Sequence, residues 1–272
     1  MKTFGARLHE LVDLRGPLCA GIDPHASLLR AWGLDDDVAG LERFALTAVE
    51  ALAPEVSVIK PQSAFYERFG SRGIAVLERV LAESRAAGAL TLLDVKRGDI
   101  GSTSQAYADA YLDPQSPLSA DAITVSPYLG FGSLAPFFDT AQRFGGGVFV
   151  LALTSNEEGP EVQHATDAQG VRVGERMLPR LAALNAGAEP LGSYGAVVGA
   201  TIAPLADPSV LDINGPLLAP GYGAQGGTDE DLRRVFGAAS QALVLPSSSR
   251  EILAAGPTVT GLVEKVRALQ GG

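Results

Sequence analysis

The segment 92–103, LLDVKRGDIGST, carries charged residues whose types and spacing suit proton transfer and electrostatic catalysis. Asp94 and Lys96 are two residues apart, so their side chains share one face if the segment is an extended strand. Asp99 follows three residues later, where the sequence turns toward a helix. Two carboxylates beside one ammonium keep a lysine protonated. A protonated lysine in a closed site is a cation, a hydrogen-bond donor and a proton source.

A second lysine, Lys60, ends the apolar run 56–60. From a neighbouring strand it would complete an alternating row of lysine and aspartate with Asp94, Lys96 and Asp99. A surface ion-pair cluster at a strand end is the alternative interpretation. Because the charges fall at the ends of two adjacent strands, where barrel enzymes place their chemistry, we favour a functional site.

A phosphate site is predicted near the end of the chain. The segment PSSSREI places small hydroxyl residues and Arg250 where a short helix begins. Backbone N–H groups at a helix start and a guanidinium together bind phosphate. The alternative is that Ser249 only caps the helix and Arg250 faces solvent.

The segment 221–227, GYGAQGG, contains four glycines and Gln225. Glycines allow close approach of the backbone to a ligand and hinge-like changes of backbone angles. The amide of Gln225 offers both a donor and an acceptor to a ligand once such a loop closes. A flexible connection without a ligand is the alternative. Two more polar residues end apolar runs, Asp23 in GIDPH and Ser126 in TVSPYLG.

These residues need a frame of strands and helices that brings them together. Eight short apolar runs lie at 18–22, 56–60, 90–94, 121–125, 147–152, 195–199, 216–220 and 242–246. Helical patterns lie between and after them at 38–52, 71–87, 102–112, 131–143, 173–186, 205–211, 229–238 and 257–270. Strands that are apolar throughout are typical of parallel sheets covered on both faces.

Eight strands that alternate with eight helices predict an α/β protein with the (β/α)₈ TIM-barrel fold. We expect one domain over residues 1–272, with an N-terminal helix in MKTFGARLHELVDLRG and a polar insertion at about 154–172. An open, doubly wound sheet is the structural alternative. In a barrel the carboxyl ends of the strands carry the chemistry, and the candidate residues above lie at or just beyond such ends.

Composition narrows the possible partners. The chain has 21 basic and 31 acidic residues, a net charge of −10, which argues against a nucleic-acid surface. The single cysteine, Cys19, excludes an intrachain disulfide, and the three histidines form no metal-binding motif, so we expect no metal. The N-terminal segment is charged and unlike a secretory signal, and no stretch has the purity of a membrane span. We expect a cytoplasmic protein that binds neither nucleic acid nor membrane.

The segment 92–103 resembles the signature D-x-K-x-x-D-I-x-x-T of the orotidine 5′-phosphate decarboxylase family. Asp94, Lys96, Asp99, Ile100 and Thr103 match it. The resemblance runs from residue 18 to about 253, through GID, VIKPQ, VSPYLG, PGYGAQGG and SSREI. The segment AFYERFG and the insertion at 154–172 resemble the bacterial type 2 branch.

The resemblance implies a TIM barrel that converts orotidine 5′-monophosphate to UMP and CO₂, the last step of pyrimidine synthesis, without cofactor or metal. It implies that Lys96 delivers a proton to C6 and that Lys60, Asp94 and Asp99 complete the charged row. It also implies a homodimer in which Asp99 crosses to the partner's site. The substrate contacts that it implies come from Asp23, Ile100, Thr103, Ser126, Gln225 and Arg250.

Two other functions stay open. A related barrel enzyme, a sugar-phosphate decarboxylase or epimerase, would pass through an enediolate and would use a divalent metal. A non-catalytic protein that binds nucleotide phosphate would keep Arg250 and Gln225 but would not need the charged row. All four charged residues are present here, which favours an enzyme.

Overall fold

The apolar runs predicted as strands pair side by side in parallel and close into a barrel. The computed structural model describes residues 1–272 except 204, 206, 224–225, 238–243 and 272. The eight strands are β1 (Cys19–Ile22), β2 (Val58–Pro61), β3 (Leu90–Arg97), β4 (Ala122–Val125), β5 (Gly147–Leu153), β6 (Tyr194–Val198), β7 (Leu217–Pro220) and β8 (Val244–Ser248). Each strand pairs with its neighbours in sequence, and β8 returns to pair with β1. The closed sheet confirms the predicted TIM barrel and excludes the open sheet.

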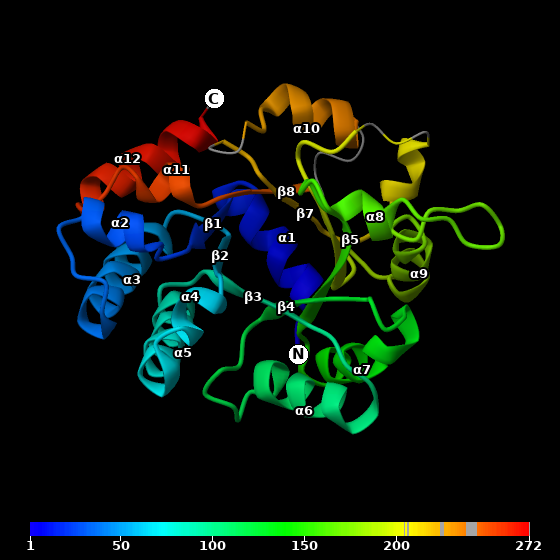
Figure 1. Ribbon diagram of the computed structural model, residues 1–272, viewed down its shortest axis with the longest axis horizontal. Helices are drawn as coiled ribbons and strands as arrows, with labels where there is room; N and C mark the ends of the chain where they lie inside the picture. Colours follow the sequence, from blue (N-terminus) through cyan, green and yellow to red (C-terminus); the bar gives the residue numbers. More distant parts are fainter. Residues whose placement is uncertain (204, 206, 224–225, 238–243, 272) are drawn as a thin grey trace.

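Helices surround this barrel (Figure 1). They are α1 (Phe4–Arg15), α2 (Ala26–Ala31), α3 (Val38–Leu52), α4 (Ala64–Glu67), α5 (Gly70–Ala86), α6 (Gly101–Leu112), α7 (Ala135–Phe144), α8 (Gly159–Gln163), α9 (Met177–Leu184), α10 (Asp229–Phe236), α11 (Arg250–Leu253) and α12 (Val259–Gln270). Two short 3₁₀ helices, η1 (Phe131–Leu134) and η2 (Pro208–Leu211), precede α7 and β7.

The predicted helix ranges agree best with the observed helices where the apolar pattern is long. Helix α3 has the predicted bounds, whereas the pattern at 131–143 divides into η1 and α7, which has a proline in its first turn. The pattern at 205–211 gives only the 3₁₀ helix η2, and residue 206 lies outside the described part. The short helices α2, α4 and α8 were not predicted, because four to six residues give too little periodicity.

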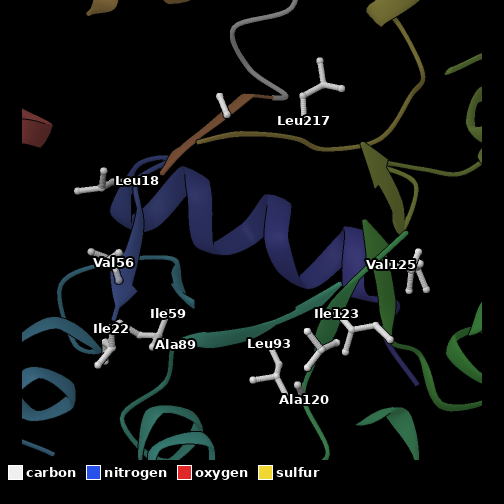
Figure 2. Close-up of a cluster of buried hydrophobic side chains, with 14 of the residues drawn as sticks. Leu18, Ile22, Val56, Ile59, Ala89, Leu93, Ala120, Ile123, Val125 and Leu217 are labelled. Carbon is white, nitrogen blue, oxygen red and sulfur yellow. The ribbon is translucent and has the colours of Figure 1, made fainter. Parts of the chain in front are cut away.

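Two apolar layers hold the barrel. The larger one lies between the strands and the surrounding helices, and Figure 2 shows part of it, including Ile22, Ile59, Leu93 and Ile123. The smaller one fills the interior of the barrel. Its members come from the strands, from α1 and from the connection before β6: Phe4, Leu8, Cys19, Val58, Leu90, Leu92, Ala122, Phe149, Leu191, Val197, Leu218 and Leu245.

Helix α1 closes the amino-terminal end of the barrel. It lies across the middle of the ring of helices in Figure 1. Phe4 meets Phe149 edge-to-face, with ring centroids 5.9 Å apart, and Arg7 forms an ion pair with Asp121 just before β4. A Cβ on Gly147 would lie 2.4 Å from the Phe4 ring, so this close approach requires glycine at the start of β5. Because α1 covers the amino-terminal end, we expect the functional site at the opposite end, where the strands have their carboxyl ends.

The polar segment expected as an insertion, 154–172, follows β5. It contains α8 and an isolated antiparallel pair between Thr166 and Arg172. No helix within the described residues has the length and apolar character needed to cross a bilayer.

Substitution of Phe4 tests the contribution of α1 to stability. Phe4 is fully buried, so we expect Phe4→Ala to lower the free energy of unfolding by about 3–5 kcal/mol. Leu14→Ala on the same helix is the control, because Leu14 is 75% exposed and its loss should change stability by less than about 0.5 kcal/mol. Denaturant unfolding measures both, and equal midpoints for the two variants would contradict this role of α1.

Candidate active site

The carboxyl ends of the strands surround two adjoining cavities that share Lys60, Asp94, Lys96 and Pro220. The first cavity, about 220 Å³, is also lined by Thr124, Leu151, Thr154, Ser155, Asn156, Val197, Gly199 and Leu218. The second cavity, about 520 Å³, is also lined by Asp23, His25, Gln62, Ala64, Phe65, Gly221, Tyr222, Ser247, Ser249 and Arg250. Three of the charged residues singled out from the sequence, Lys60, Asp94 and Lys96, thus lie where the two cavities meet.

Asp94 stands between two lysines. The Lys96 ammonium donates to both carboxylate oxygens of Asp94, at 2.7 and 2.8 Å, and the Lys60 ammonium lies 3.6 Å from Oδ2. The hydroxyl of Thr124 donates to Oδ1 at 2.7 Å, and the amide oxygen of Gln62 accepts from Lys96 at 3.3 Å. Lys60 and Asp94 are buried, whereas the Lys96 side chain is 46% exposed to the cavities and solvent. This arrangement places one accessible proton donor above a fixed, buried ion pair.

Burial and neighbouring charges shift the pKa values of Lys60 and Asp94 in opposite directions. Burial alone would lower the pKa of Lys60, but the carboxylates of Asp23 and Asp94 outweigh it and hold the pKa above its ordinary value. Burial would raise the pKa of Asp94, but Lys60, Lys96 and the hydroxyl of Thr124 lower it. Both groups of the buried pair are therefore ionised at neutral pH.

The backbone brings Asp94 and Lys96 together in a way that differs from the prediction. Leu93 pairs with Ile123 and Arg97 with Val125, so β3 carries two more residues than β4 between these pairs. Lys96 has a positive φ of 46°, in the left-handed region, so the segment is not a regular extended strand. Such a backbone costs about 1–2 kcal/mol outside glycine. A bulge, and not the alternation of a strand, directs the Lys96 side chain back onto Asp94.

Asp99, Ile100 and Thr103 lie away from this row, at the start of α6. The carboxylate of Asp99 accepts a hydrogen bond from the backbone N–H of Ile100 at 2.8 Å. Ile100 is 62% exposed and Thr103 is exposed as well. No ion pair within the described residues includes Asp99. Within a single chain the row therefore has three members and not the four expected from the spacing.

Arg250, which also lines the second cavity, begins α11 with its side chain exposed. Ser249 holds the N-cap position, but its hydroxyl makes no capping hydrogen bond, so only the exposure of Arg250 agrees with the alternative interpretation of the sequence. The buried hydroxyl oxygens of Ser248 and Ser249, and Oδ1 of Asp23, have no partner among the described residues. A cation beside unpartnered hydroxyls suits an anionic ligand such as phosphate.

The glycine-rich loop lies next to Arg250 in this cavity. Gly221 and Tyr222 line it, and Tyr222 pairs with Gly227 across the loop. Gln225, which the sequence singled out, lies outside the described residues.

Ser126 does not line either of these cavities. It lies in a third cavity of about 320 Å³ that shares Leu151 and Asn156 with the first. Ser155, directly after β5, lines the first cavity together with the charged row. Because 154–172 was expected to be an insertion, Ser155 was missed, although a polar triplet at the end of a barrel strand was a usable signal. Thr124 was missed because it lies within an otherwise apolar strand.

The described residues contain no group of three or more histidine, cysteine, aspartate or glutamate side chains arranged to hold a metal ion. The arrangement instead supplies the ammonium groups of Lys60 and Lys96 beside both cavities and the guanidinium of Arg250 in the second one. It suits an anionic ligand whose reaction develops negative charge.

Comparison with known proteins shows the family of the chain. The sequence model of the "Orotidine 5'-phosphate decarboxylase / HUMPS family" matches residues 16–263. An orotidine 5′-phosphate decarboxylase of Nocardioides sp. is 70% identical over 93% of this chain and 92% of its own length. One from Streptomyces coelicolor is 64% identical over 96% of this chain and 94% of its own length.

Solved structures agree with the sequence relatives. A crystal structure from Streptomyces avermitilis, assigned to the same decarboxylase, has a TM-score of 0.92 and 60% identity, covering 100% of this chain and 97% of its own. The OMP decarboxylase of Leishmania donovani has a TM-score of 0.74 and 29% identity, covering 99% and 100%. With the match running through every strand of the barrel, the chain belongs to the orotidine 5′-phosphate decarboxylase / HUMPS family.

Proposed function

We propose that this chain decarboxylates orotidine 5′-monophosphate to UMP and CO₂, the final step of pyrimidine nucleotide synthesis. The observation that carries the proposal is the Lys60–Asp94–Lys96 row, buried at its base and open to a cavity that Arg250 also lines. The relatives from Nocardioides and Streptomyces coelicolor carry the name of this decarboxylase, at identities of 70% and 64%.

Lys96 is the proton donor in this proposal. Loss of CO₂ from C6 leaves a carbanion with no cofactor to delocalise its charge. A nearby ammonium stabilises that charge as it develops, and then protonates the carbon. Lys96 suits both tasks, because its ammonium is exposed to the cavity while Asp94 orients it through both carboxylate oxygens.

Asp94 and Lys60 act as a fixed pair beneath it. Asp94 stays ionised between two ammonium groups, and its negative charge would repel the substrate carboxylate until CO₂ leaves. Lys60 holds this charge in a buried position that would otherwise favour protonation. No metal or cofactor enters this scheme.

The rest of the substrate is held by groups remote from C6. Arg250 binds the phosphate, with Gln225 bridging base and phosphate, and Asp23 contacts a ribose hydroxyl. Binding energy from the unreactive phosphate can position the ring and favour closure over it. In this proposal Ser126 contacts the pyrimidine ring, and Ser155, which lines the first cavity together with the charged row, is a second candidate for a ring contact.

We also propose a homodimer with shared sites. Asp99, Ile100 and Thr103 lie at the start of α6, and the exposed apolar side chain of Ile100 suits contact with a second subunit. In this arrangement Asp99 completes the charged row of the partner and Thr103 contacts its ribose. A cytoplasmic location stays a prediction.

The alternatives are weaker on specific grounds. The family model covers more than one activity by its description, so a sugar-phosphate enzyme is the runner-up. The relatives at 64% and 70% identity carry only the decarboxylase name, which favours the nucleotide. A protein that merely binds nucleotide phosphate would not need two lysines around a buried carboxylate.

Activity in the presence of a chelator separates the enzyme candidates. We expect purified protein in EDTA to decarboxylate orotidine 5′-monophosphate. The change in the absorbance of the nucleotide measures this reaction. Lys96→Ala should lower kcat by at least about 10⁴-fold, because it removes both the proton donor and the stabilising charge. Circular dichroism checks that the variant folds. Turnover by Lys96→Ala near the wild-type rate would remove Lys96 as the acid. A folded wild-type protein that leaves orotidine 5′-monophosphate intact would contradict the proposed reaction and favour the sugar-phosphate alternative.

Truncation of Arg250 tests the phosphate contact. We expect Arg250→Ala to lower kcat/KM roughly 30- to 1,000-fold, a loss of about 2–4 kcal/mol of transition-state stabilisation. The causes are a lost charge-assisted contact and poorer closure. Arg43→Ala, at an exposed position on α3, is the control and should leave kcat/KM within about twofold of wild type. An unchanged kcat/KM for Arg250→Ala would refute the assignment.

Mixing two inactive variants tests the shared site. Lys96→Ala and Asp99→Ala, each with little activity alone, are refolded together so that subunits exchange. If Asp99 crosses the interface, each mixed dimer contains one intact site, and activity should recover to at most about a quarter of wild type. Absence of recovery, with mixed dimers demonstrated by mass spectrometry, would place Asp99 in the site of its own chain.

A further inference from the structure

The backbone around Lys96 depends on one side chain that belongs to a different strand. Thr124 of β4 is 1% exposed, and its hydroxyl lies in the gap that the β3 bulge opens between the two strands. There it accepts a hydrogen bond from the backbone N–H of Lys96 at 3.0 Å. It also donates one to Oδ1 of Asp94 at 2.7 Å.

The two bonds fix each other's direction. A hydroxyl has one proton and two acceptor lone pairs. The N–H of Lys96 can only donate, so it uses a lone pair of Thr124 and leaves the proton for the ionised carboxylate of Asp94. One small group therefore ties the left-handed backbone at Lys96 to the orientation of the carboxylate that receives the Lys96 ammonium.

We propose that Thr124 is a positioning residue of this decarboxylase: its hydroxyl holds the bulged backbone of Lys96 and the carboxylate of Asp94 in the one arrangement that presents the ammonium to the substrate. The inference rests on the proposed function. Valine has nearly the same shape but can form neither bond, whereas serine can form both.

The chain offers a matched control at the opposite end of the barrel. Thr91 of β3 is also fully buried, and its hydroxyl accepts from the backbone N–H of Asp121 at 3.0 Å. It donates to the Asp121 carboxylate at 2.9 Å. A similar pair of bonds thus joins β3 to the residue that precedes β4, away from the residues that line the cavities, so Thr91→Val measures the purely structural cost of losing such a hydroxyl.

The test compares Thr124→Val, Thr124→Ser and Thr91→Val in steady-state kinetics, with inhibition by UMP and thermal unfolding measured alongside. We expect Thr124→Val to lower kcat by about 10- to 100-fold, because small misplacements of reacting groups are that costly. Its inhibition constant for UMP should stay within about twofold of wild type, because the phosphate contact is untouched. Thr124→Ser should recover most of kcat. Thr91→Val should lower the Tm while kcat stays within about twofold.

Three results would overturn the proposal: a kcat for Thr124→Val near wild type, equal losses for the Ser and Val variants, or a kcat loss for Thr91→Val as large as that for Thr124→Val. If Thr124→Val does not fold, Thr124→Cys replaces it, because a thiol is a poor donor of similar size, and the same losses are expected. A wild-type protein that leaves orotidine 5′-monophosphate intact would instead sink the proposed function itself.

Discussion

A carboxylate held between two ammonium groups, in a place with little water, is the interaction on which the rest of this structure depends. Asp94 is 6% exposed, and its burial would be costly if either lysine were absent. With Lys60 beneath it and Lys96 above it, the charge is neutralised and the ammonium of Lys96 is aimed by two short hydrogen bonds. Fixed charge of this kind needs no reorganisation when a carbanion forms beside it.

The cost of this arrangement falls on the backbone. Lys96 adopts a left-handed conformation in a bulge, and the strand loses its regular register with β4 over that stretch. Strain of this sort persists only where the surroundings over-determine it. Here Thr124 holds the N–H of Lys96, and the backbone carbonyl of Arg97 accepts from the N–H of Ser126 immediately after the bulge.

The residues that stabilise the barrel and the residues that form the candidate site lie at opposite ends of the barrel axis. At the amino-terminal end, α1 covers the interior, and Phe4 packs edge-to-face on Phe149. At the carboxyl end the layers give way to two cavities and the charged row. The same hydroxyl chemistry recurs at both ends, with Thr91 serving the fold and Thr124 facing the site.

The sequence alone predicted eight parallel strands and favoured a barrel, because uniformly apolar runs separated by helical patterns must bury both faces of a parallel sheet. The closed pairing of β8 with β1 then excluded the open sheet. The sequence also identified Lys60, Asp94, Lys96 and Arg250, since strand ends converge in this fold. Only the tertiary structure decided how Lys96 reaches Asp94, because a positive φ on a lysine has no local signature. It alone placed Ser155 in the cavity of the charged row, since that cavity is formed by strands far apart in the chain.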